Sequence, residues 1–196
     1  LGAIQSKKEM RMILETLSQP KAAKLLKKGK YEIAGILPAG AVYLFANDKT
    51  IDTVGELQGK KIATFDYDSA AMHMVRHVGA SIVGSSTANF AGKFNNGIVD
   101  IVIMPALAYN TFELYRGLGK DGGILDLRLF YGMIQAIARK SAFPDDFGYQ
   151  MRKYMVNRIS HINAMIDEAE RTIPHKYWIK TDKQTKDDLD YFYKDI

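Results

Sequence analysis

The chain of 196 residues contains no cysteine. Disulfide bonds, thiolate metal sites and cysteine nucleophiles are therefore excluded, whereas a cytoplasmic and a periplasmic location are both compatible with this composition. The sequence also lacks any run of about 18 apolar residues, the length that a transmembrane helix requires. No basic segment followed by an apolar one, as in a signal peptide, precedes the body, and the chain begins at Leu1 rather than at methionine. We therefore expect a processed N-terminus or a fragment.

Positive charge is too dispersed to indicate a nucleic-acid-binding protein. The formal net charge is +5, and the lysines are spread out except in residues 21–30, K-A-A-K-L-L-K-K-G-K. Such a segment can bind nucleic acid or anionic lipid. However, Pro20 and an apolar stripe from Ala22 to Leu26 predict a helix that ends at Gly29 and carries its lysines on a solvated face. We therefore predict no nucleic-acid partner.

Candidate metal ligands are few. His73 and His77 lie four residues apart on a helix predicted from Ser69 to Val78, which is the spacing of two ligands on one helical face. The pattern H-M-V-R-H lacks the glutamate of the zinc-protease signature, and Arg76 on the same side would repel a cation. Solvated histidines explain this pattern better. We predict no metal, no cofactor and no catalytic residue.

Hydrophobic periodicity predicts a mixed α/β fold. Apolar runs of strand length alternate with segments whose apolar residues recur at helical spacing, and Gly, Pro, Asn and Asp separate them. The expected elements, in chain order, are a helix at 7–17, the helix at 20–29, strands at 31–37 and 41–46 with a turn at 38–40, a helix at 53–59, a strand at 61–65, the helix at 69–78, a strand at 81–83, a helix through Phe90 and Phe94, a strand at 98–104, a helix from Pro105, strands at 124–130 and 133–139, one long helix from Pro144, and a charged helix from about Thr181.

The stretch from Asp52 to Pro105 forms one α/β module and contains the expected ligand site. Its strand Lys61–Phe65 leads into a polar loop, residues 66–69, which feeds the N-terminus of the next helix. Ligands of open α/β sheets bind outside the carboxyl ends of the strands, where helix N-termini also point. A small molecule is therefore expected at this loop.

The motifs G-E-L-Q-G-K-K-I, G-A-S-I-V, G-I-V-D and F-P-D-D follow one another along the chain. In these motifs and their order, the module resembles the second lobe of the extracytoplasmic solute-binding proteins of tripartite (TRAP-type, DctP-like) transporters. The resemblance implies an α/β, type II periplasmic-binding-protein-like fold, with two lobes, a hinge and an incomplete first lobe. The implied division is 1–58 for the partial first lobe, 59–127 for the second lobe, and 128–196 for the return strand, long helix and C-terminal helix.

The same resemblance implies a non-enzymatic periplasmic protein that captures a small-molecule solute for membrane transporter or efflux subunits. This chain is also similar to a divergent group of such proteins linked to RND-type efflux and aminoglycoside resistance. In many family members an arginine clamps an organic acid, aided by a second basic residue and an asparagine. Here those three positions hold Ala63, Tyr43 and Met104. A carboxylate ligand would thus lose its expected partners.

The loop after the strand offers a different chemistry. Asp66, Tyr67 and Asp68 could hold an ammonium group or a polyamine through charge and cation–π contact. Alternatively, Asp68 caps the following helix and Asp66 interacts favourably with its dipole. The predicted ligand-binding residues are Tyr43, Phe65, Asp66, Tyr67, Asp68, Met104 and Tyr109.

The sequence is also compatible with two other functions. An adaptor of an efflux or envelope complex, with a vestigial cleft, would be consistent with Ala63 and with a shortened first lobe. An enzyme would need a base, a nucleophile or a metal set converging on one cleft. Apart from His73 and His77, the candidates are His161, His175 and Ser69, and the chain contains no G-x-S-x-G elbow. We therefore rank the enzyme last.

Overall fold

The computed structural model describes residue 4 and residues 6–188. These residues form two compact units. Unit 1 contains Ala41–Phe130 and the C-terminal part from Ala169, and unit 2 contains the N-terminal part up to Gly40 together with Tyr131–Glu168. The chain thus passes from one unit to the other in the middle of a strand, near the start of another strand and within a helix.

Unit 1 is built on a mixed sheet. The strands run in the order β4-β3-β5-β2-β6-β8. β3 is parallel to β4 and β5, whereas β2 is antiparallel to β5 and β6. The strands are β2 (Tyr31–Ala46), β3 (Lys61–Phe65), β4 (Ser81–Ser85), β5 (Ile101–Pro105), β6 (Gly123–Leu125) and β8 (Trp178–Ile179).

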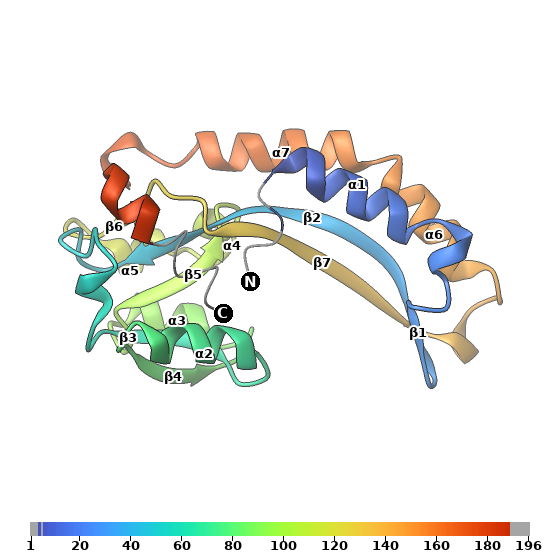
Figure 1. The fold of residues 1–196 in the computed structure, drawn as a ribbon, viewed down its shortest axis with the longest axis horizontal. Coiled ribbons are helices and arrows are strands. Elements are labelled where there is room, and N and C mark those ends of the chain that lie inside the picture. Colours follow the sequence, from blue (N-terminus) through green and yellow to red (C-terminus); the bar gives the residue numbers. More distant parts are fainter. Residues whose placement is uncertain (1–3, 5, 189–196) are drawn as a thin grey trace. The chain divides into compact units, whose positions relative to one another are not determined.

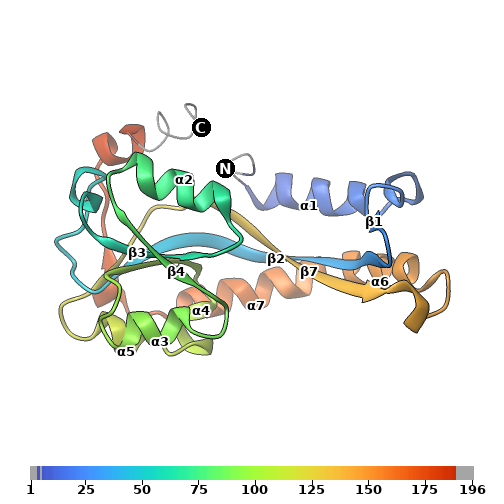
Figure 2. The same ribbon diagram turned by 90° about the horizontal axis from the view of Figure 1, so that it is seen from below.

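Helices cover both faces of this sheet. α2 (Ser69–His77) lies on one face, and the short helices α3 (Phe90–Asn95), α4 (Ala108–Thr111) and α5 (Tyr115–Leu118) lie on the other (Figures 1 and 2). The strands are therefore buried on both sides, which explains why β5 consists of consecutive apolar residues. Single 3-10 turns at Gly55–Leu57 and His175–Tyr177 and a helical segment at 183–188 complete the unit.

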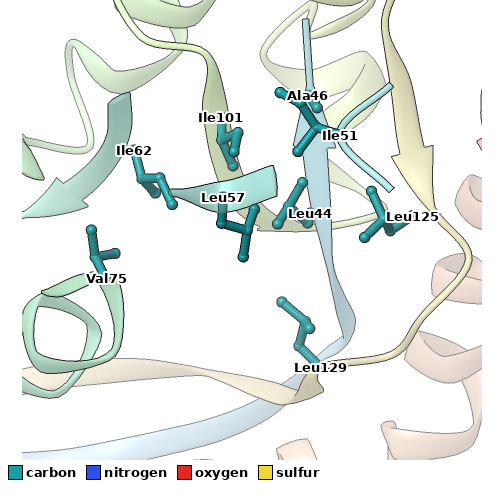
Figure 3. Packing of buried hydrophobic residues seen from close by; sticks show 9 residues of the cluster. All are labelled: Leu44, Ala46, Ile51, Leu57, Ile62, Val75, Ile101, Leu125 and Leu129. Carbon is teal, nitrogen blue, oxygen red and sulfur yellow. The ribbon is translucent and has the colours of Figure 1, made fainter. Parts of the chain in front are cut away.

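The face of the sheet that α2 covers is closely packed (Figure 3). Every second residue of the strands points to this side, where helix and loop residues meet them. The remaining cavity there has a volume of about 30 Å³, roughly the share of one water molecule. The buried cluster consists of Leu44, Ala46, Ile51, Leu57, Ile62, Val75, Ile101, Leu125 and Leu129.

Unit 2 contains a ribbon of β2 and β7 (Phe130–Arg139), with the short strand β1 (Lys27–Lys28) at one end, between helices. The first part of β2 pairs with both of these strands. Figure 2 shows α1 (Lys7–Leu17) on one side of the ribbon and α6 (Phe147–Val156) on the other. The next helix is α7 (Ile159–Arg171), and 3-10 turns lie at Pro20–Ala22 and Lys140–Ala142. The buried core of the unit is Met10, Leu14, Leu26, Ile36 and Ile159.

A buried ion pair joins β2 to α6 inside unit 2. Arg152 Nη1 lies 3.7 Å from Glu32 Oε2, and the side chains are 1% and 5% exposed. The same nitrogen donates a hydrogen bond of 2.7 Å to the Ile33 carbonyl. A buried charge is tolerated only when it is paired or hydrogen-bonded, so these contacts fix the position of the helix on the strand.

Some of the predicted elements are confirmed by the structure, whereas other predictions are wrong. α1 and β3 have the predicted bounds. The helix predicted at 20–29 is wrong, because only Pro20–Ala22 forms a 3-10 turn and Lys27–Lys28 pairs with β2. The hairpin turn contains Gly29 at φ +54°, a backbone conformation that glycine adopts without strain. Strand pairing therefore overrides the helical pattern.

The predicted turn at 38–40 is also wrong, because β2 continues through Pro38 as one strand of 16 residues. Proline removes a hydrogen-bond donor, but its φ is compatible with extended backbone. The helix predicted at 53–59 is only the turn Gly55–Leu57, although Glu56 Oε2 accepts a bond of 2.9 Å from the Asp52 N–H. Pro105 ends β5 instead of starting a helix.

The strands predicted at 98–104 and 124–130 are shorter or shifted, at Ile101–Pro105 and Gly123–Leu125. The long helix predicted from Pro144 is two helices, α6 and α7, which are separated after Val156. The Arg158 N–H bonds to the Met155 carbonyl, a three-residue bond that tightens the last turn and interrupts the α-helical pattern. Apolar periodicity alone does not reveal such a break.

Candidate functional site

The loop after β3 presents an aromatic and acidic surface. The rings of Phe65 and Tyr67 are stacked, with centroids 5.4 Å apart and planes 11° from parallel. Tyr67 is 75% exposed. Asp66, the residue between Phe65 and Tyr67 in the sequence, also has an exposed side chain. The Asp66 N–H donates to the Ser85 carbonyl at 3.1 Å, which attaches the loop to the end of β4. This loop therefore shows both a carboxylate and an aromatic ring to solvent.

Asp68 has a structural role at the start of α2. Its Oδ1 accepts a hydrogen bond of 2.9 Å from the Ala71 N–H, which satisfies one of the unpaired donors of the first helical turn. The capping role that the sequence offered as an alternative for Asp68 is therefore present. In the described structure, the Asp66 carboxylate accepts no such capping bond from the helix.

Two neighbours modify the surroundings of Asp66. A Cβ atom on Gly84 would lie 2.3 Å from Asp66 Oδ1, so the carboxylate packs against bare backbone at this position. The Lys93 ammonium donates a hydrogen bond to the Gly84 carbonyl. A cation therefore lies near the acidic loop, and it reduces the local negative potential without forming a described ion pair with Asp66.

Tyr43 and Met104 are direct partners across β2 and β5. Since Ala63 is the partner of Val102 on β3 and β5, Phe65 stands on the same face of the sheet as Met104 and Tyr43. Phe65 and Met104 are half-buried, but Tyr43 is only 1% exposed. The structure thus brings three of the predicted residues onto one face, at the carboxyl end of β3 and β5.

An arginine that the sequence reasoning missed lies at the end of the Tyr43 side chain. Arg128 Nε donates a hydrogen bond of 3.2 Å to the Tyr43 hydroxyl, and Arg128 Nη2 lies 3.5 Å from Glu170 Oε1. The edge of Trp178 packs on the Tyr43 ring at 5.1 Å between centroids. Arg128 and Tyr43 are 85 positions apart, and no local pattern connects them. Only the fold could reveal this cluster.

The surroundings of Tyr43 change its ionisation. Burial raises the pKa of Tyr43 well above the ordinary value of 10.0, and the hydrogen bond from Arg128 opposes this effect. Above about pH 10 the unfolded chain therefore loses a proton that the folded chain keeps, so stability falls as pH rises. The contribution of Tyr43 to this loss is up to about 1.4 kcal/mol per pH unit.

We predict that Tyr43→Phe makes the free energy of unfolding fall less steeply between about pH 10 and pH 11. The measurement is urea unfolding at a series of pH values, and the difference between variant and parent isolates Tyr43 because all other groups titrate in both. Tyr154→Phe, which removes the hydroxyl of an exposed tyrosine, is the control and should leave the slope unchanged. Equal slopes for Tyr43→Phe and the parent would contradict the prediction.

Tyr109, the remaining predicted residue, lies in a different aromatic group. It is buried, and its ring is 5.8 Å from Tyr115 and 6.1 Å from Tyr177 between centroids. Burial raises the pKa of Tyr109 as well. The described ring contacts therefore connect Tyr109 to α5 and to the turn at His175–Tyr177 rather than to the loop after β3.

The histidines of α2 are placed as solvated residues. His73 and His77 are both exposed. Within the described residues, no group of three or more histidine, aspartate or glutamate side chains is arranged to hold a metal ion. In the same part of the chain, no helix combines the length and the apolar character needed to cross a membrane.

Solved structures identify the fold of this chain. A TRAP periplasmic solute-binding protein from Desulfovibrio salexigens with bound orotic acid has a TM-score of 0.78 at 14% identity, covering 99% of this chain and 63% of that chain. The ectoine-binding protein of the Halomonas elongata TRAP transporter has a TM-score of 0.77 at 12% identity, over 98% and 66%. The predicted mixed α/β, periplasmic-binding-protein-like fold is confirmed, as part of that fold.

The sequence itself identifies the family. A family model described as solute-binding protein AdeT 1/2 matches residues 1–193, and the chain belongs to this family. The probable solute-binding protein AdeT1 of Acinetobacter baumannii is 39% identical over 183 residues, which are 93% of this chain and 60% of that protein. The predicted resemblance to solute-binding proteins is therefore confirmed, although this chain spans less than two thirds of the length of that relative.

Proposed function

We propose that this chain is a non-enzymatic, periplasmic solute-binding protein that captures a small polar solute with a cationic group. In this proposal it hands the solute to membrane transporter or efflux subunits. Membership in a solute-binding family and likeness to periplasmic binding proteins support the class. The observation that carries the choice of a cation is that this short loop exposes both the Asp66 carboxylate and the Tyr67 ring, which is stacked on Phe65.

The chemistry of the loop favours a cation over an anion. A carboxylate attracts an ammonium group, and an aromatic face attracts it further when the cation lies within about 6 Å of the ring. Asp68 adds a second negative charge nearby, even while its Oδ1 caps α2. At the position where relatives are expected to carry an acid-clamping arginine, the small Ala63 leaves no positive charge.

The proposed ligand-binding residues differ in how a solute could reach them. Asp66 and Tyr67 are exposed, and Phe65, Asp68 and Met104 are half-buried. Tyr43 and Tyr109 are buried, so contact with a solute would require these two side chains to become more exposed. We therefore propose that the exposed and half-buried residues make the first contacts.

We also propose that the chain is divided into two lobes as the sequence predicts. Residues 59–127 would form the second, ligand-binding lobe, residues 1–58 would belong to the first lobe, and residues 128–196 would supply the return strand and the C-terminal helices. Closing of two lobes around a solute would remove water from the acidic loop and strengthen its attraction for a cation.

Thermal unfolding with a panel of solutes tests the proposal. A solute that binds only the folded state raises the melting temperature by mass action, so polyamines and aminoglycosides should raise it. The double variant Asp66→Asn, Asp68→Asn should lose this shift, and it should still fold because asparagine also caps helices. Asp145→Asn, which neutralises an exposed aspartate of unit 2, is the matched control.

The outcomes separate the candidate functions. A shift with cations that survives in the double variant would show that the cation binds elsewhere. A shift with dicarboxylates alone would contradict the proposed solute class while keeping the solute-binding function. No shift with any solute would favour the adaptor instead.

A further inference from the structure

We propose that the basic end of unit 2, which consists of residues 21–31 and 139–146, docks on the surface of an anionic lipid membrane. This inference goes beyond the proposed function. The docking surface belongs to unit 2, whereas the acidic loop that is proposed to hold the solute belongs to unit 1. Docking of this kind would keep the protein beside a membrane whatever solute it carries.

The excess positive charge of the chain is concentrated in the basic end. Its two segments contain seven lysine and arginine residues and two aspartates, which gives a net charge of +5. The whole chain also has a formal net charge of +5, so all the other residues together are neutral. A membrane that contains anionic lipids attracts such a local excess of cations. The seven cationic residues, all exposed, are Lys21, Lys24, Lys27, Lys28, Lys30, Arg139 and Lys140.

The fold joins the two basic segments into one surface. Instead of completing a helix, Lys27–Lys28 pairs with the start of β2 in a hairpin. The Lys140 N–H donates a hydrogen bond of 2.9 Å to the Lys30 carbonyl, and the Arg139 guanidinium lies over the Tyr31 ring, 5.8 Å from its centroid. Figure 1 shows the hairpin and the segment after β7 at the same end of unit 2. Cations from distant parts of the sequence can therefore contact one partner together.

These cations are available to a partner. Within the described residues, none of the seven forms a salt bridge with a carboxylate. Lys27 and Lys140 both line a pocket of about 450 Å³, which is in the range of small-molecule sites. Two other lining residues are Ser141, whose hydroxyl can donate to a phosphate, and Asp145, whose carboxylate can accept from a hydroxyl. The pocket therefore suits a phosphate-containing lipid headgroup that also carries hydroxyl groups.

Exposed apolar side chains accompany the cations. Leu25, which follows Lys24 directly, is 80% exposed, the largest fraction of any large apolar side chain in the described part of the chain. Tyr31 and Phe143 are exposed as well. Lysines together with aliphatic and aromatic side chains are typical of segments that bind in the headgroup region of a membrane. A lipid bilayer has an apolar layer directly beneath its charged groups, whereas nucleic acids and acidic proteins do not. The combination therefore favours a lipid surface.

Co-sedimentation with lipid vesicles tests the inference. The protein should bind vesicles of equal parts phosphatidylcholine and phosphatidylglycerol, should not bind pure phosphatidylcholine, and should bind less as the salt concentration rises. The triple variant Lys27→Gln, Lys28→Gln, Lys30→Gln should weaken binding about 100-fold, because each lysine near an anionic surface contributes roughly fivefold.

The matched control is Lys49→Gln, Lys120→Gln, Lys180→Gln, which removes the same charge from exposed lysines of unit 1. It should leave the affinity within about twofold of the parent, because these residues lie outside the docking surface. Both triple variants change only exposed side chains, so circular dichroism should show the fold of the parent. Equal weakening by the two triple variants would indicate attraction by net charge alone and would overturn the inference, as would failure of the parent to bind anionic vesicles.

Leu25→Ser separates a lipid surface from other anionic partners. Insertion of Leu25 between headgroups predicts that this variant binds anionic vesicles up to about tenfold more weakly. Met165→Ser, which changes an exposed side chain of α7, is the control and should not affect binding. Binding of a single-stranded oligonucleotide or of polyglutamate as tight as binding of vesicles, with no effect of Leu25→Ser on either, would overturn the membrane as the partner.

Discussion

Replacing Arg152 by methionine should lower the free energy of unfolding by about 3–5 kcal/mol. The change leaves the Glu32 carboxylate buried without its positive partner, and it removes the donor to the Ile33 carbonyl. Methionine has a similar length, so the loss of packing is small by comparison. Urea unfolding followed by far-UV circular dichroism measures the effect.

The double variant Glu32→Gln, Arg152→Met separates charge from packing. With the carboxylate neutralised, most of the lost stability should return, leaving a deficit of about 1–2 kcal/mol for the unpaired polar groups. Arg11→Met is the control, because Arg11 pairs with Glu15 on the exposed side of α1. That change should cost less than about 0.5 kcal/mol. A double variant as unstable as Arg152→Met alone would mean that the buried charge is not the cause.

Replacing Gly122 by alanine should destabilise unit 1 by about 3 kcal/mol or more. The added Cβ would lie 2.5 Å from the Leu118 carbonyl oxygen and 2.6 Å from the Ala46 carbonyl oxygen. Both atoms belong to the backbone, so no side chain can rotate away. The single tryptophan, Trp178, is paired with Ile124 just after this position, so its fluorescence reports on the local unfolding.

Gly92→Ala makes the same chemical change with the opposite expected result. Gly92 lies in α3, and a Cβ there would have no atom within 4 Å. Alanine has the higher helix propensity and reduces the entropy of the unfolded chain, so stability should rise by up to about 1 kcal/mol. If both glycine variants were equally stable, the clash at Gly122 would be refuted.

The part of the candidate site that is continuous in sequence could be predicted. The strand Lys61–Phe65, the polar loop and the helix cap at Asp68 follow from an apolar run, from its acidic neighbours and from the position of the helix. Arg128 and Glu170 could not be found in this way, because they meet Tyr43 only through the folding of distant segments. The predicted contact residue Tyr109 joins Tyr115 and Tyr177 for the same reason, through contacts that spacing does not encode.

The sequence by itself determined the fold class, the family and most of the central elements of unit 1, because these depend on local periodicity and on residues close in the chain. The tertiary structure decided three things that local patterns leave open. It joined residues 31–46 into one strand, it paired Lys27–Lys28 with that strand instead of completing a helix, and it separated α6 from α7. In each case the outcome depends on hydrogen bonds and packing between the segment and its surroundings. Such interactions outweigh local propensities, which differ by less than about 1 kcal/mol per residue.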